Sequence, residues 1–300
     1  MKMGTEDELR HFEMLYDRAC EPDRDSKADV WDTQADHWDQ KYRAKDEREL
    51  HEVRIRDTAA WLREQGMLGP EQDVIDVGCG PGRYVAEFAK TALSVMGTDI
   101  SPKMTEYGEA YCREQGLCNV SFQAADFQNA DVEALGWTGK FDLAYSSITP
   151  AVSGLKGLDN FIRVSRAWCF NASFVYSENF LHADLMQTLF DRQPRRSRAS
   201  HSHSFYELFS LLWLRGYYPI THYYKQYREI RIAADRDSAR RMAGFLLKKE
   251  EVTQDNVTRI QRYLEDHADA SGHLTDASDC WFGWLLWDVR ERKERHFPSI

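Results

Sequence analysis

Short apolar runs alternate with amphipathic segments from about residue 73 to residue 289. This alternation is typical of a sheet whose strands are joined by helices. The apolar runs predict seven strands, over Asp73–Val77, Leu93–Gly97, Val120–Gln123, Phe141–Ser146, Ser173–Ser177, Tyr217–Tyr224 and Trp281–Val289. The pattern therefore predicts an α/β fold with helices on both faces of a mostly parallel, seven-stranded sheet.

Helical periodicity appears before the sheet and again before its last strand. Amphipathic stretches at Trp31–Tyr42 and Leu50–Gln65 predict N-terminal helices, which we assign to a helical lid over residues 1–70. The remaining domain spans residues 71–300. Within it, apolar residues recur at helical spacing over about 235–279, which predicts a helical insertion that caps the site or covers an edge of the sheet.

Charge and composition limit the class of partner. The chain has 39 basic and 49 acidic residues, a net charge of −10, which opposes the basic surface expected of a nucleic-acid-binding protein. We therefore expect a small-molecule partner and neither a nucleic-acid nor a membrane partner. Six cysteines without a C-x-x-C pair, and no legible leader or membrane span, favour a cytoplasmic protein.

The segment after the first predicted strand carries the clearest motif. Asp76 precedes Gly78, Gly80 and Gly82 at alternating positions, where the chain leaves a strand and enters a helix. Glycine permits turn geometry and a close approach of the backbone to a ligand, so a nucleotide-like ligand is expected. Arg83 stands where a nicotinamide-binding fold needs a small residue, which disfavours an oxidoreductase.

With this motif, the sequence resembles the class I S-adenosylmethionine-dependent methyltransferases over roughly residues 30–290. The resemblance implies a Rossmann-like sheet with an antiparallel final strand, and S-adenosyl-L-methionine as the cofactor. It also implies an acid for the ribose hydroxyls at Asp99, next to Ile100, and an acid for the adenine amino group at Asp126, next to Phe127. The further cofactor-binding residues that we expect are Asp76, Gly78, Gly80, Gly82 and Ser146, with Trp38 and Tyr42 as an aromatic lid or as core packing.

The acceptor site is less clearly marked. The run after the fourth strand, Ser147–Pro150, lacks the sequences typical of DNA amino- or cytosine-C5-methylating enzymes, and we expect Thr149 to contact the acceptor. Four arginines fall within residues 192–198, so Arg195 and Arg196 are expected to bind an anionic acceptor unless this segment is only a solvated loop. The candidates for a general base are His182, His201 and His203, and no metal site is expected.

The sequence thus predicts an S-adenosylmethionine-dependent methyltransferase that acts on a small, anionic acceptor. The atom that is methylated is left open among O, N, C and S. The alternative is a non-catalytic sensor or scaffold that binds an adenosyl ligand and keeps the fold.

Overall fold

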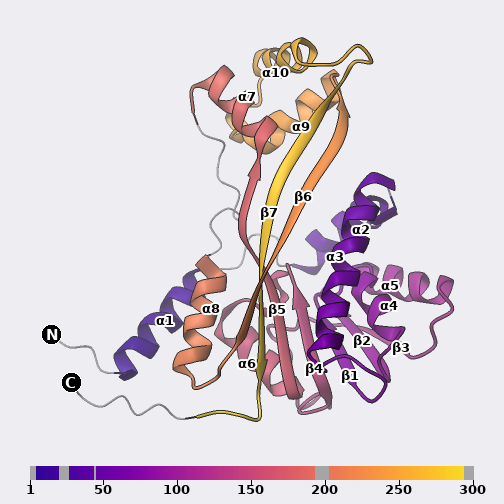
Figure 1. The fold of residues 1–300 in the computed structure, drawn as a ribbon, viewed down its shortest axis with the longest axis vertical. Coiled ribbons are helices and arrows are strands. Elements are labelled where there is room, and N and C mark those ends of the chain that lie inside the picture. The colour runs from indigo at the N-terminus through magenta and orange to yellow at the C-terminus, as the bar shows by residue number, and fades with distance from the viewer. Residues whose placement is uncertain (1–4, 20–26, 44, 193–202, 294–300) are drawn as a thin grey trace. The chain divides into compact units, whose positions relative to one another are not determined.

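A seven-stranded sheet with the order β3-β2-β1-β4-β5-β7-β6 organises the chain (Figure 1). The computed structural model describes residues 5–19, 27–43, 45–192 and 203–293. The strands are β1 (Asp73–Val77), β2 (Ser94–Asp99), β3 (Val120–Ala124), β4 (Phe141–Ser147), β5 (Ser165–Asn179), β6 (Ile220–Ala233) and β7 (His273–Asp288). The predicted number of strands is confirmed.

The first five strands form the parallel part of the sheet. β1 pairs in parallel with β2 on one side and with β4 on the other, β2 pairs with β3, and β4 pairs with β5. The register places Asp76 of β1 beside Gly97 of β2 and Tyr145 of β4. The last strand, β7, runs antiparallel beside β5, as the resemblance implies.

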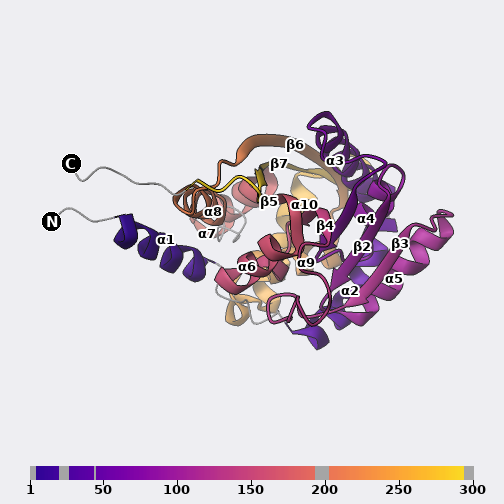
Figure 2. The ribbon, with the colours of Figure 1, turned by 90° about the horizontal axis from the view of Figure 1, so that it is seen from below.

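Helices on both faces of the parallel strands complete this part of the fold (Figure 2). On one face, α4 (Arg83–Ala89) and α5 (Pro102–Glu114) pack against β1, β2 and β3. Outside them, α2 (Ala28–Arg43) contacts α5, and α3 (Lys45–Glu64) contacts α4. On the other face α6 (Gly154–Val164) packs against β4, and α1 (Thr5–Ala19) packs against α6 and α8 (His203–Leu214).

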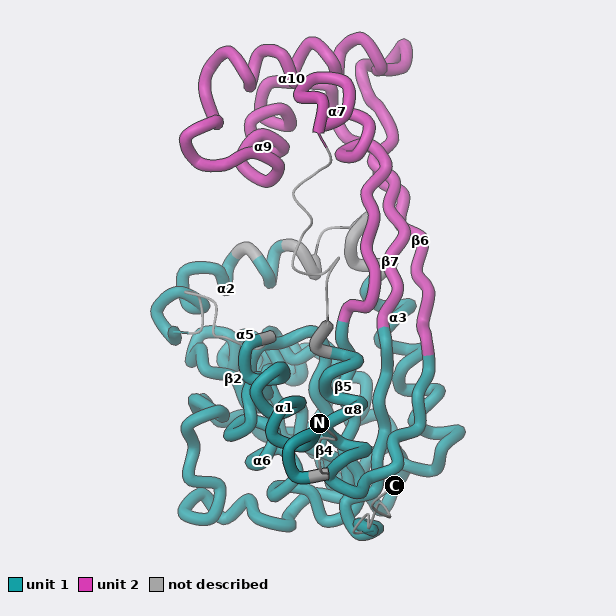
Figure 3. Tube along the Cα trace, turned by 90° about the vertical axis from the view of Figure 1, so that its left-hand side faces the viewer, with its two compact units in different colours: residues 1–173, 203–222, 283–300 teal, residues 174–202, 223–282 magenta. Residues whose placement is uncertain are grey.

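The chain divides into two compact units (Figure 3). Unit 1 comprises residues 1–173, 203–222 and 283–300, and unit 2 comprises residues 174–202 and 223–282. Unit 2 contains the outer parts of β5, β6 and β7 together with α7 (Phe180–Phe190), α9 (Arg236–Leu246) and α10 (Gln254–Asp266). The helices α9 and α10 confirm the predicted helical insertion before the last strand.

Unit 2 has a hydrophobic core of its own. Its three helices bury an aliphatic cluster that includes Leu185 of α7, Ala243 of α9 and Ile260 of α10, each 0% exposed. A separate core of this size allows unit 2 to hold its shape through its own packing.

Three strands are much longer than the apolar runs that predicted them. The predictions Tyr217–Tyr224 and Trp281–Val289 are too short because β6 and β7 continue in unit 2, and Ser173–Ser177 is too short mainly because β5 already begins at Ser165 in unit 1. In β6 the additional residues alternate between exposed and half-buried positions and include many charged side chains. A strand with two partly solvated faces carries no continuous apolar run, so its length was not legible from hydrophobicity.

No helix among the described residues is both long enough and apolar enough to cross a membrane.

Candidate functional site

The loop between β1 and α4 turns at three glycines, all in unit 1. Gly78, Gly80 and Gly82 have φ angles of 75°, 50° and 70°, in the left-handed region that residues with a Cβ rarely adopt. The amides of Gly78 and Cys79 donate to the carbonyl of Thr98 in β2, at 2.8 and 3.0 Å. The loop is therefore fixed to the carboxyl end of β2, where ligands of open α/β sheets bind.

The glycines serve different purposes in this turn. A Cβ on Gly78 would lie 2.2 Å from Oγ1 of Thr149, so the loop after β4 is packed directly against this position. A Cβ on Gly80 would have no atom within 4 Å. The backbone at Gly80 is therefore open to close approach by a ligand.

Asp99 connects the glycine loop to the next helix. Its Oδ2 accepts from the amide of Gly80 at 2.9 Å, and its Oδ1 accepts from the amide of Ser101 at 3.0 Å. Burial raises the pKa of the Asp99 carboxyl, and the amides of Ser101 and Gly80 oppose this by stabilising the carboxylate. Each carboxylate oxygen can accept a second hydrogen bond, so Asp99 still has the capacity to bind a vicinal diol.

Asp76 is more deeply buried than Asp99. It is 2% exposed, and its Oδ2 has no hydrogen-bond partner in the described part of the chain. Burial raises the pKa of Asp76 well above its ordinary value, and the negative charge of Asp99 raises it further. A buried carboxyl without a partner is costly, which is typical of a ligand-binding position rather than of a folding contact.

The end of β4 contributes a second buried polar group. Ser146 is 0% exposed, and its Oγ has no hydrogen-bond partner among the residues described. Ile148 follows with a φ of 53°, a strained conformation for a β-branched residue. Thr149, the predicted acceptor contact, accepts a hydrogen bond from the amide of Ala151 at 3.2 Å and packs on Gly78.

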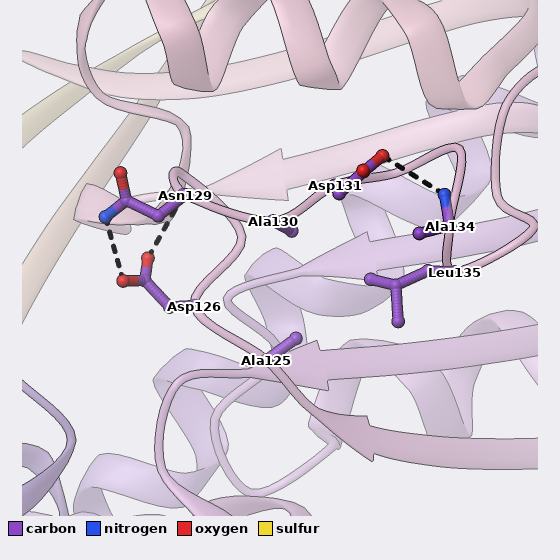
Figure 4. Close-up of a pocket in the computed structure, with 7 residues that line it drawn as sticks. All are labelled: Ala125, Asp126, Asn129, Ala130, Asp131, Ala134 and Leu135. Carbon is purple, nitrogen blue, oxygen red and sulfur yellow. Dashed lines mark hydrogen bonds between the residues drawn. The ribbon is translucent and has the colours of Figure 1, made fainter.

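The loop after β3 holds Asp126 on the surface. Both oxygens of its carboxylate bind Asn129, Oδ1 the amide at 3.3 Å and Oδ2 the side chain at 2.9 Å. The neighbouring Phe127 is 2% exposed and stacks on Trp137. A pocket of about 370 Å³ lies beside this loop (Figure 4), lined by Ala125, Asp126, Asn129, Ala130, Asp131, Ala134 and Leu135.

Asn160 of α6 fixes the loop after β3 through hydrogen bonds. Its side-chain amide is buried and donates to the carbonyls of Phe127 and Ala130, each at 3.0 Å. Gln128 donates in turn to the carbonyl of Pro150, at 2.5 Å, in the segment after β4. The loops that follow β3 and β4 are therefore held as one structure. Sequence reasoning missed Asn160, because a lone Asn on a helix gives no signal of such a contact.

The helix α2 is attached to the site by three aspartates on one of its faces. Asp32 accepts from the side chain of Ser101, and Asp36 accepts from Nζ of Lys103 at 2.9 Å and from the hydroxyl of Tyr107. Asp39 pairs with Arg83 at 3.2 Å, directly after the glycine loop. Arg83 also lies over the ring of Tyr111, 3.6 Å from its centroid.

Sequence reasoning missed these contacts as well. The spacing 32, 36, 39 places all three carboxylates on one helical face and was a readable signal. Trp38, predicted as part of a lid, lies half-buried in the same helix. Tyr42 also belongs to α2, but its side chain lies outside the described residues.

The predicted acceptor residues that the structure describes are divided between unit 1 and unit 2, and others lie outside the described residues. His182 lies near the start of α7 in unit 2, where burial lowers its pKa, Asp276 raises it and Arg228 lowers it. His201, Arg195 and Arg196 lie outside the described residues, as does the side chain of His203, the first residue of α8. The residues predicted to bind the cofactor are all in unit 1.

Within the described ranges, no cluster of three or more His, Cys, Asp or Glu side chains is arranged to bind a metal ion.

The middle of unit 1 matches a known family. Residues 74–166 fit the family model described as a methyltransferase domain. Over 93 residues the chain is 30% identical to the 23S rRNA (uracil(1939)-C(5))-methyltransferase of Shewanella sediminis, which covers 31% of this chain and 20% of that protein. Over 80 residues it is 34% identical to the 2-heptyl-1-hydroxyquinolin-4(1H)-one methyltransferase of Mycobacteroides abscessus, which covers 27% of this chain and 33% of that protein. The chain thus spans a fifth to a third of the length of these curated relatives.

A solved structure shares the fold. The magnesium protoporphyrin IX methyltransferase of Synechocystis PCC 6803, crystallised with bound SAH, superposes with a TM-score of 0.50 at 18% identity. The superposition covers 67% of this chain and 91% of that one. The Rossmann-like methyltransferase fold expected from the resemblance is thereby confirmed.

Replacing Gly78 should damage the fold more than replacing Gly80. Gly78→Ala combines left-handed strain with a clash against Thr149, for an expected loss of about 2–5 kcal/mol in the free energy of unfolding. Gly80→Ala carries only the strain, about 1–2 kcal/mol. Urea unfolding without ligand measures both. Equal losses would show that Thr149 yields to the new methyl group and does not fix the loop.

Removing the carboxylate of Asp39 should loosen α2. Asp39→Ala removes the carboxylate that the largely buried Arg83 guanidinium binds, and hydrogen bonds between charged groups contribute about 1.5–3 kcal/mol. Hydrogen exchange of the α2 amides should therefore become about tenfold faster or more. Gln40→Ala, at an exposed position of the same helix, is the matched control. Unchanged exchange in Asp39→Ala would exclude this ion pair as the anchor of the helix.

Proposed function

We propose that the chain is a class I methyltransferase that transfers a methyl group from S-adenosyl-L-methionine to a small, anionic acceptor, supported by the methyltransferase-domain match of residues 74–166. The proposal rests on the arrangement at the carboxyl ends of β1 and β2. There Asp99 accepts a hydrogen bond from the amide of Gly80 in the glycine loop, and Oδ2 of the buried Asp76 has no hydrogen-bond partner among the described residues.

The residues at this edge suit the parts of the cofactor. Asp99 has the acceptor capacity for the two ribose hydroxyls, and the open backbone at Gly80 admits the amino-acid portion. Ile100, Asp126 and Phe127 follow the ends of β2 and β3, on the adenine side, and Ser146 ends β4 next to the glycine loop. When bound, the cofactor supplies an activated methyl group on a positively charged sulfur.

The helix α2 would restrict water access to this site. Its aspartates bind Ser101, at the start of α5, and Arg83, directly after the glycine loop. These are the two segments that Asp99 also connects. We propose that α2, with Trp38 and Tyr42, forms the lid over the bound cofactor, within the helical region of residues 1–70.

Methyl transfer from sulfonium requires alignment of the acceptor and, for a protonated acceptor, a base. We propose Thr149 as an acceptor contact, since it lies against Gly78 at the end of β4. His182, His201 and His203 are the candidate bases, and Arg195 and Arg196 would bind the anionic group. The net charge of −10 supports a small molecule over a nucleic acid.

Labelled methyl transfer tests the proposal directly. Incubation with methyl-labelled S-adenosylmethionine and a metabolite extract should label an anionic small molecule, which mass analysis identifies. Total RNA, DNA and protein serve as parallel acceptors. Label in RNA alone would replace the small-molecule acceptor with a nucleic acid, as in the Shewanella relative. Cofactor binding without transfer to any pool would favour the sensor or scaffold function.

The ribose contact can be tested by substitution. Asp99→Ala removes a charged acceptor for the ribose hydroxyls and for the amide of Gly80, and each such bond contributes about 1.5–3 kcal/mol. Affinity for S-adenosylmethionine should fall at least about tenfold in calorimetry. Glu71→Ala, at an exposed carboxylate of unit 1 just before the amino end of β1, is the control. An unchanged dissociation constant in Asp99→Ala would remove Asp99 from the site.

A further inference from the structure

The buried carboxyl of Asp76 has an unusual position for an acidic group. It is 2% exposed, lies next to the end of β1 and leaves Oδ2 without a hydrogen-bond partner in the described part of the chain. Most buried carboxylates are paired with cations or bound to several donors. Asp76 therefore needs another means of avoiding an uncompensated buried charge.

Among the residues that the structure describes, burial and the negative charge of Asp99 are the influences on Asp76, and both disfavour its carboxylate. On β2 its register partner is Gly97, and the acid acting on it from the end of that strand is Asp99. On β4 its register partner is the buried phenol of Tyr145, and the thiol of Cys79 faces it from the glycine loop. A carboxyl, a phenol and a thiol are each neutral when protonated and negative when deprotonated. The negative charge around Asp76 can therefore be lowered only if some of these groups keep their protons.

Physical chemistry then favours the neutral acid. Desolvation disfavours the carboxylate, and a second carboxylate nearby disfavours it further, so both effects raise the pKa of Asp76. Asp99 is better able to remain charged, because the amides of Gly80 and Ser101 donate to it. Of the two acids, Asp99 is therefore the hydrogen-bonded carboxylate and Asp76 the protonated neighbour.

Resting on the proposed function, we propose that Asp76 holds a proton in the ligand-free protein and releases it to solvent when the sulfonium cofactor binds. The carboxylate so formed then favours the positively charged methyl donor over the neutral thioether product. Asp76 is in this sense a residue that determines cofactor specificity, through charge rather than through shape.

The direction of the pH dependence follows from linkage. Ligand binding lowers the pKa of Asp76 from its raised value in the free protein, so protons leave on binding and affinity increases with pH. While the acid form dominates, affinity for S-adenosylmethionine should rise by up to about tenfold per pH unit. S-adenosylhomocysteine has the same adenosine and amino-acid groups but no charge on sulfur, so its affinity should rise less.

Calorimetry measures the proton directly in the native protein. Titration of each ligand in two buffers of different ionisation enthalpy, at several values between about pH 6 and pH 8, gives the number of protons released. We expect more protons released with S-adenosylmethionine than with S-adenosylhomocysteine. The ligand amino groups titrate near the upper end of this range, so native and variant proteins are compared at each pH and this contribution cancels.

Two variants assign the proton to its source. Asp76→Asn, which keeps the shape of the side chain, should abolish the extra release and reduce the preference for the charged ligand. Asp99→Asn should keep the release but move the rise in affinity to lower pH, because the charge that raises the pKa of Asp76 is lost. Cooperative thermal unfolding without ligand shows whether each variant is folded.

The outcomes separate this inference from the proposed function. Failure of the native protein to bind S-adenosylmethionine would overturn the proposed function. Binding with equal proton release for both ligands would overturn the role of Asp76 alone, and so would undiminished release in Asp76→Asn. If Asp76→Asn fails to fold, the difference in proton release between the two ligands, measured with the native protein, still tests the proposed role of Asp76.

Discussion

One carboxylate holds the functional edge of the sheet together. Asp99 receives the amide of Gly80 on one oxygen and the amide of Ser101 on the other. It therefore fixes the glycine loop of one βα unit against the helix start of the next. Ser101 also caps α5 through its Oγ, which donates to Asp32 of α2. The glycine loop, the start of α5 and α2 are thus all held by hydrogen bonds to residues 99–101.

The electrostatics of this edge follow from burial. Asp99 lies close enough to Asp76 for its carboxylate to raise the pKa of Asp76, in surroundings that include the buried Tyr145 and Cys79. Charges interact more strongly there than in water. A positively charged ligand relieves this repulsion and a neutral one does not, so the pair of acids would favour a cation through charge alone.

The sequence predicted what depends on local chemistry. Three glycines after a buried strand indicated a turn that residues with a Cβ would obstruct, and all three have φ angles in the left-handed region. The long strands of unit 2 could not be predicted, because their polar, half-exposed residues carry no apolar run. The spacing of the α2 aspartates could be read from the sequence, but the pairing of Asp39 with Arg83 could not, nor could the contact of Asn160 with the loop after β3, since each joins residues far apart in sequence.

The family match covers part of unit 1 and does not extend into unit 2. Residues 74–166 contain β1 to α6, and with them the glycine loop, Asp99, Asp126 and Ser146, which are the groups suited to the methyl donor. Unit 2 lies outside this segment and has a separate core of α7, α9 and α10. The relatives match over only 93 and 80 residues and are named for an RNA and for a quinolone, so these matches do not indicate one class of acceptor. Apart from Thr149, the proposed acceptor residues, from His182 to His203, all lie outside residues 74–166, so the choice of acceptor depends largely on the part of the chain that the family match does not include.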